Sequence, residues 1–89
     1  MKNKITIALP ERIFGCSTIE VTASSTQSAY QELIANFPKQ YADLFVRKNE
    51  LIVPKAYVTI FVNNEICYLL DVPLKDGDSL SLSLAIAGG

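Results

Sequence analysis

The sequence predicts an α+β fold in which one main helix crosses a mixed β-sheet. Apolar residues alternate with polar ones near both ends of the chain and again in its second half, as in half-buried strands. Between these segments lies one with apolar residues three and four positions apart, as in an amphipathic helix. Strands and a helix in so short a chain favour two packed layers.

The composition indicates one small globular domain. The chain has 89 residues, of which 49% are hydrophobic and 19% charged, with a net charge of −1. We expect a single domain over residues 1–89 with one modest core. The absence of a basic cluster argues against a nucleic-acid partner. The absence of a long apolar segment argues against membrane insertion or secretion and predicts a cytoplasmic location.

Two strands and the main helix are predicted in the first half. Residues 4–9 alternate up to Pro10, and residues 17–21 give a second strand, which together suggest an antiparallel hairpin with a wide loop. Residues 24–27 offer N-cap side chains, and Pro38 ends the helix. The helix would turn one apolar face inward, made of Ala29, Tyr30, Leu33, Ile34 and Phe37.

The second half is predicted to begin with a short second helix or an irregular turn within residues 39–48, followed by a polar loop over residues 47–50. Residues 56–62 have the strongest strand propensity and are expected at the centre of the sheet. Their core face would hold Val58, Ile60 and Val62. After the turn at Asn63-Asn64, residues 65–68 suggest a short edge strand.

The last fourteen residues combine a turn, a strand and a thin terminus. Asp76-Gly77-Asp78 leads into a strict Ser/Leu alternation that ends in Gly88-Gly89. Residues 85–89 are expected to be a flexible tail, and its two glycines, having no Cβ, could pass through a narrow channel and leave the terminal carboxylate unhindered. That carboxylate is either a reacting group or simply a frayed end. The complete order of elements is that of the β-grasp (ubiquitin-like) fold.

The chain has few residues with which to catalyse a reaction by itself. It contains no histidine, and Cys16 and Cys67 match no metal-binding or redox spacing. We expect two buried or partly buried free thiols, no metal and no cofactor. The chain is therefore predicted not to be an enzyme.

Three motifs resemble the small sulfur-carrier proteins of the MoaD/ThiS type, which include the small subunit of molybdopterin synthase. The motifs are Val62-Asn63, the turn Pro73-Leu74-Lys75-Asp76-Gly77-Asp78, and the terminal Gly88-Gly89. The loop of residues 9–15 is a weaker marker. The length resembles the molybdopterin synthase subunit more than the shorter thiamine carrier.

The resemblance implies a carrier acting as a co-substrate. A separate E1-like enzyme would use ATP to adenylate the carboxylate of Gly89, next to Gly88, and the adenylate would become a thiocarboxylate. The large subunit of molybdopterin synthase, or another sulfur-accepting enzyme, would receive the sulfur. Thiamine, cysteine and secondary-metabolite pathways remain alternatives to molybdenum-cofactor biosynthesis.

A partner is expected to dock on the outer face of the sheet, which leads to the diglycine. This predicted docking surface comprises Tyr57, Thr59, Phe61, Ser81, Ser83 and, in the tail, Ile86. Exposed aromatic side chains favour such a role because aromatics are enriched at interface hot spots. Two alternatives stay open: a ubiquitin-like modifier that is joined to target lysines, and an interaction module whose diglycine is not used.

Overall fold

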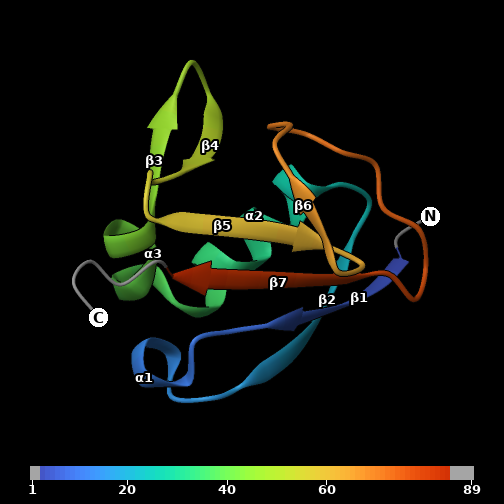
Figure 1. Ribbon diagram of the computed structural model, residues 1–89, viewed down its shortest axis with the longest axis horizontal. Coiled ribbons are helices and arrows are strands. Elements are labelled where there is room, and N and C mark those ends of the chain that lie inside the picture. The colour runs from blue at the N-terminus through green and yellow to red at the C-terminus, as the bar shows by residue number, and fades with distance from the viewer. Residues whose placement is uncertain (1–2, 85–89) are drawn as a thin grey trace.

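The computed structural model describes residues 3–84, and residues 1–2 and 85–89 lie outside the described part. Within these described residues, seven strands and three helices follow one another; Figure 1 shows their arrangement. They are β1 (Asn3–Ala8), α1 (Glu11–Phe14), β2 (Thr18–Ala23), α2 (Thr26–Asn36), α3 (Pro38–Leu44), β3 (Phe45–Lys48), β4 (Leu51–Pro54), β5 (Val58–Val62), β6 (Glu65–Cys67) and β7 (Ser79–Leu84).

Five of the strands form one mixed sheet in the order β2-β1-β7-β5-β6. The pair β1–β7 is parallel, whereas β1–β2, β5–β7 and β5–β6 are antiparallel. The predicted α+β β-grasp fold, with a mixed sheet, one main helix and a short second helix, is confirmed. The expected centre of the sheet was wrong: β5 is an interior strand, but the central position belongs to β7.

Helix α2 is the main helix and packs on one face of the sheet (Figure 1). It begins with a capping box, in which Ser25 Oγ accepts from the Ser28 N–H at 3.3 Å and Ser28 Oγ accepts from the Ser25 N–H at 3.0 Å. Ala29, Tyr30 and Leu33 are buried against the sheet. The core beneath them includes Ile5, Ile7 and Leu80, which are almost completely inaccessible to solvent.

The predicted polar loop over residues 47–50 was wrong for Arg47 and Lys48, which belong to β3, whereas Asn49 and Glu50 do form a turn. Strands β3 and β4 pair as an antiparallel hairpin that stands beside the main sheet (Figure 1). Asn49 and Glu50 close it with φ of 50° and 68°, as in the two-residue turns that suit the twist of a hairpin. The short second helix is present as α3, and the loop of residues 9–15 contains the additional one-turn helix α1.

Besides the core packing of Phe45 and Ile52, a buried glutamine side chain bonds this hairpin to the rest of the domain. Gln27 accepts from the main-chain N–H of Ile52 through Oε1 at 2.9 Å. Its Nε2 donates to the carbonyl oxygens of Ile52 at 2.8 Å and Leu70 at 2.5 Å. Gln27 thus satisfies backbone groups on β4 and on the segment after β6, as a neighbouring strand would.

Candidate functional site

The candidate site begins with β7, the strand that leads to the chain end. Its Ser/Leu alternation separates the two faces of the sheet as predicted, with Leu80 and Leu82 buried in the core. Leu84 pairs with Val58 of β5, and Ser81 pairs both with Phe61 of β5 and with Ala8 of β1. The chain beyond Leu84 therefore follows directly on a strand that is hydrogen-bonded to neighbours on both sides.

The register of β7 is fixed where the strand begins. Asp78 accepts hydrogen bonds from the Lys75 N–H at 2.8 Å and from Asn63 Nδ2 at 3.0 Å. Asn63 Oδ1 in turn accepts from the Ser79 N–H at 3.0 Å. The hydrogen bond from the main chain of Lys75, followed by that from Asn63, lowers the pKa of Asp78. Two of the motifs that carry the family resemblance thus meet in one network that aligns β7.

A second contact fixes the same turn to β1. Asp76 Oδ1 accepts from the Lys4 N–H at 2.7 Å, and the Gly77 N–H donates to the Lys4 carbonyl at 2.9 Å. Gly77 has φ of 90°, a region in which a Cβ is unfavourable. The positive φ explains why a glycine stands at this position of the turn. The neighbouring Asp76 and Asp78 have a structural role, because their carboxylates accept hydrogen bonds from main-chain N–H groups.

The structure brings together four of the residues expected on the docking surface. Thr59 pairs with Ser83 and Phe61 pairs with Ser81, so all four lie on the face of the sheet opposite the core. On the other side of Phe61 is its partner in β6, Ile66, which is 47% exposed. Sequence reasoning missed Ile66, although its position three residues after Asn63 in a two-residue hairpin would have placed it beside Phe61.

Tyr57 has a different setting from the other predicted docking residues. It precedes β5, and its hydroxyl group donates to the carbonyl oxygen of Asp43 near the end of α3. Phe61 lies four residues further, about 13 Å along an extended chain. The structure therefore ties Tyr57 to α3 and does not place it beside Phe61. Ile86, Gly88 and Gly89 lie outside the described residues.

A shallow hollow of about 480 Å³ lies where β7 reaches Leu84. The first turn of α1 contributes one wall and the end of β7 the other; the lining residues are Pro10, Glu11, Arg12, Ile13, Leu82, Ser83 and Leu84. Gly15, with φ of 79°, ends α1 by donating its N–H to the Glu11 carbonyl at 2.8 Å. The loop of residues 9–15 thus lies next to the end of β7 at Leu84.

The two cysteines are free thiols and partly buried, as predicted. Cys67 Sγ donates to the Leu69 carbonyl at 3.5 Å, whereas Cys16 packs at the border of the core. Within residues 3–84, Cys, Asp and Glu side chains form no group of three that could hold a metal ion. No helix of this part of the chain has the length and apolarity needed to cross a membrane.

Comparison with known proteins gives matches in structure alone. No protein-family model matches the chain, and no curated protein matches it in sequence. Small archaeal modifier protein 1 (SAMP1) from Methanosarcina acetivorans superposes with a TM-score of 0.83 at 15% identity, covering 100% of this chain and 99% of that one.

Two further similar structures are protein–protein complexes. A chain of the BexX/CysO complex from Amycolatopsis orientalis gives a TM-score of 0.75 at 23% identity, with 96% of this chain and 99% of that chain covered. A chain of the complex of subunits 1 and 2 of Molybdopterin-converting factor from Helicobacter pylori gives 0.64 at 19% identity, with 97% and 99% covered. The resemblance to MoaD/ThiS-type proteins is thereby confirmed in structure, and what the chain shares with them is the ubiquitin-like β-grasp fold.

Proposed function

We propose that this protein is a sulfur carrier whose terminal glycine carboxylate is the reacting group. The observation that supports the proposal most directly is the position of β7 at the centre of the sheet, immediately before Ala-Ile-Ala-Gly-Gly. Hydrogen-bonded neighbours on both sides make β7 a rigid base. A rigid base followed by two residues without side chains suits delivery of a carboxylate into a narrow site on another protein.

The proposed chemistry takes place on Gly89 and is catalysed by a partner. The carboxylate attacks the α-phosphorus of ATP, which forms an acyl-adenylate and releases pyrophosphate. Hydrosulfide then attacks the acyl carbon, the C–O bond to AMP breaks, and a thiocarboxylate remains. Adenylation is needed because a free carboxylate is a poor acceptor for a nucleophile, whereas AMP is a good leaving group. The chain supplies a positioned carboxylate and acts as co-substrate, without catalysing the step.

The partners we propose are an E1-like adenylyltransferase and a sulfur-accepting enzyme such as the large subunit of molybdopterin synthase. Phe61 and Ile66 give the outer face an apolar centre, bordered by Thr59, Ser81 and Ser83. An apolar centre with a polar rim is typical of protein interfaces. Molybdenum-cofactor biosynthesis is the favoured pathway, because the chain length and the Molybdopterin-converting factor structure both agree with it.

A ubiquitin-like modifier remains the second candidate, because the fold is also that of an archaeal modifier protein. The same activated Gly89 would then form an isopeptide bond with a lysine of a target protein. The two functions differ in the product, which is a thiocarboxylate in one case and a protein conjugate in the other.

Intact mass spectrometry of the protein purified from its own host tests the proposal. Replacement of one carboxylate oxygen by sulfur adds about 16 mass units to a chain ending at Gly89, and alkylation with iodoacetamide should tag that species. Cys16→Ser/Cys67→Ser protein serves as control, because its only tagged sulfur would be the thiocarboxylate. Lysine-linked conjugates without the heavier species would favour the modifier. If neither the thiocarboxylate nor a conjugate is found, both functions are contradicted.

A further inference from the structure

Four of the five large hydrophobic side chains that are exposed in the described part of the chain lie at or just after β6, at one edge of the sheet; the fifth, Tyr57, precedes β5. Tyr68 is 85% exposed, Leu69 70%, Ile66 47% and Leu70 41%. We call these four residues the apolar edge. They are separate from the start of the tail, because β6 is two strands away from β7. Contiguous exposed apolar surface of this kind marks interaction sites.

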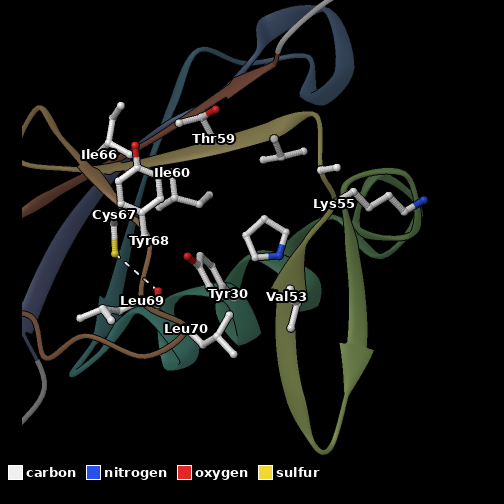
Figure 2. Close-up of a pocket in the computed structure, with 13 residues that line it drawn as sticks. Tyr30, Val53, Lys55, Thr59, Ile60, Ile66, Cys67, Tyr68, Leu69 and Leu70 are labelled. Carbon is white, nitrogen blue, oxygen red and sulfur yellow. Dashed lines mark hydrogen bonds between the residues drawn. The ribbon is translucent and has the colours of Figure 1, made fainter.

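Two hollows share Ile66, Tyr68 and Leu69 of the apolar edge as a common wall, and Leu70 also lines the first of them. One, of about 340 Å³, lies between this wall and Val53 and Pro54 of β4. Figure 2 shows Tyr30 between the two sides, with Leu69 and Leu70 on one side and Val53 on the other. The second, of about 570 Å³, extends from the same wall toward Val62 and Val72.

The main chain of β6 is able to accept another strand. Asn63 and Asn64, with φ of 51° and 70°, form a two-residue turn, so Val62 and Glu65 make the hydrogen-bonded pair that closes the hairpin. Bonded and non-bonded positions alternate along an antiparallel pair. The N–H and C=O of Ile66 therefore point away from β5, toward the free edge.

The other edge of the sheet is protected in a way that the β6 edge is not. The outer positions of β2 are occupied by Thr18, Glu20 and Thr22, which are polar and exposed. Charged and polar residues on an edge strand discourage added strands. Beyond β6 the chain instead presents tyrosine and two leucines.

Charge indicates what kind of segment would fit. Glu65 and Asp71 stand at the two ends of the apolar edge, and residues 63–74 contain no lysine or arginine. On the opposite wall, Lys55 keeps its charge, but its side chain extends toward α3, where its Nζ donates to the Ala42 carbonyl at 2.9 Å (Figure 2). A complementary partner would be apolar in its middle and basic at its ends.

Area distinguishes a peptide segment from a second copy of this chain. A large side chain has about 150–250 Å² of surface, so the apolar edge offers roughly 450 Å². A stable interface needs about 800 Å² on each partner. A short extended segment matches the smaller area.

We propose that the edge of β6 and the 68–70 segment form a docking site for an extended segment of a partner protein, apolar in its middle and basic at its ends. The segment would add as a strand by pairing with Ile66, and its side chains would enter the two hollows. This site is independent of the chemistry proposed for Gly89.

The test uses the full chain, labelled with ¹⁵N, and a synthetic peptide of alternating valine and threonine between two terminal lysines. Saturable chemical-shift changes centred on residues 65–70 are expected. Ile66→Pro should weaken binding about tenfold or more, because proline removes the outward N–H, whereas Ile66→Val should bind as the wild type does.

Side-chain variants keep the test valid if the proline variant fails to fold. Tyr68→Asp and Glu65→Lys are both at exposed positions and should weaken binding, while Glu20→Lys on the other edge should not. Absence of saturable shifts, equal loss with Glu20→Lys, or changes centred on Phe61 would overturn the proposal. A concentration-dependent dimer that Tyr68→Asp abolishes would also overturn it, in favour of a second copy. The peptide-binding result does not depend on whether Gly89 forms a thiocarboxylate, so failure of one proposal can be told from failure of the other.

Discussion

At the residue scale, the most informative polar groups are those that hold β7 in place. Asp78 accepts from the main chain of Lys75 and from the side chain of Asn63, both of which favour its ionised form. Asn63 also binds Ser79, the first residue of β7. The acidic turn that resembles the carrier family thus has a mechanical purpose: it sets the register of the strand that carries the tail.

The lowered pKa of Asp78 predicts how stability depends on pH. Because the folded pKa lies below the ordinary value, the carboxylate contributes stability above that value and loses it as the pH falls through the folded pKa. Asp78→Asn should therefore unfold more easily at neutral pH and lose less stability on acidification. Urea unfolding at several pH values between 7 and 2.5 measures both effects. An acid dependence as steep as that of the wild type would contradict this assignment.

Gln27 predicts a larger effect on stability. Gln27→Met keeps much of the side-chain volume but leaves the main-chain groups of Ile52 and Leu70 without their partner. Leaving buried polar groups unpaired costs about 1–3 kcal/mol, so we expect a loss of about 2 kcal/mol in free energy of unfolding. Gln31→Met, an exposed glutamine on the same helix, is the matched control. Equal stability of the two variants would show that Gln27 is not needed as a bridge.

At the element scale, β7 was predictable and the β3–β4 hairpin was not. The strict alternation of serine and leucine could form only a strand with one buried face. Residues 45–54, in contrast, place Arg47, Lys48 and Glu50 in the middle of the hairpin, which in sequence resembles a loop. Pairing with β4 overrides this local signal, because it satisfies main-chain groups that side-chain composition does not reveal.

Candidate site residues followed the same logic. Thr59, Phe61, Ser81 and Ser83 were correctly placed on one face, since a strand's side chains alternate whatever its neighbours are. Tyr57 also fits that alternation, but it lies just before β5, and its hydroxyl group donates to the main-chain carbonyl of Asp43. Such a contact depends on where α3 ends, which the sequence pattern does not specify.

The outer face of the β5–β7 pair makes a prediction about binding. Phe61→Asp should weaken association with the proposed E1-like partner by about 2 kcal/mol, roughly thirtyfold, as expected for a hot-spot aromatic residue. Phe61 is only partly buried, so the domain should stay folded. Titration calorimetry measures the affinity, and Thr22→Asp, on the same face but in edge strand β2, is the control. Unchanged affinity of Phe61→Asp would place the interface elsewhere.

At the scale of the whole molecule, the chain end is connected to the centre of the fold. β7 is last in sequence among the described elements and lies between the N-terminal strand β1 and the strand β5. Its residues Leu80 and Leu82 belong to the same buried cluster as Ile5 and Ile60. The sheet is therefore complete only when β7 lies between β1 and β5. Leu84, the last residue of β7, is held in place by this pairing.

This arrangement predicts that folding and function separate at Leu84. Deleting Gly88 and Gly89 should leave the thermal unfolding temperature unchanged, because the ladder pairs of β7 with β1 and β5 that the structure describes involve Ser79–Leu84 and neither glycine. The same deletion should abolish thiocarboxylate formation, since the reacting carboxylate would be lost. Leu80→Ala, at a position with no solvent exposure, should instead cost about 2–5 kcal/mol of stability. Differential scanning calorimetry and intact mass measured on both variants check the two halves of the prediction. A large fall in unfolding temperature on deleting the glycines would mean that the end of the chain is part of the packed fold, and a carboxylate held in that way could not be delivered to a partner.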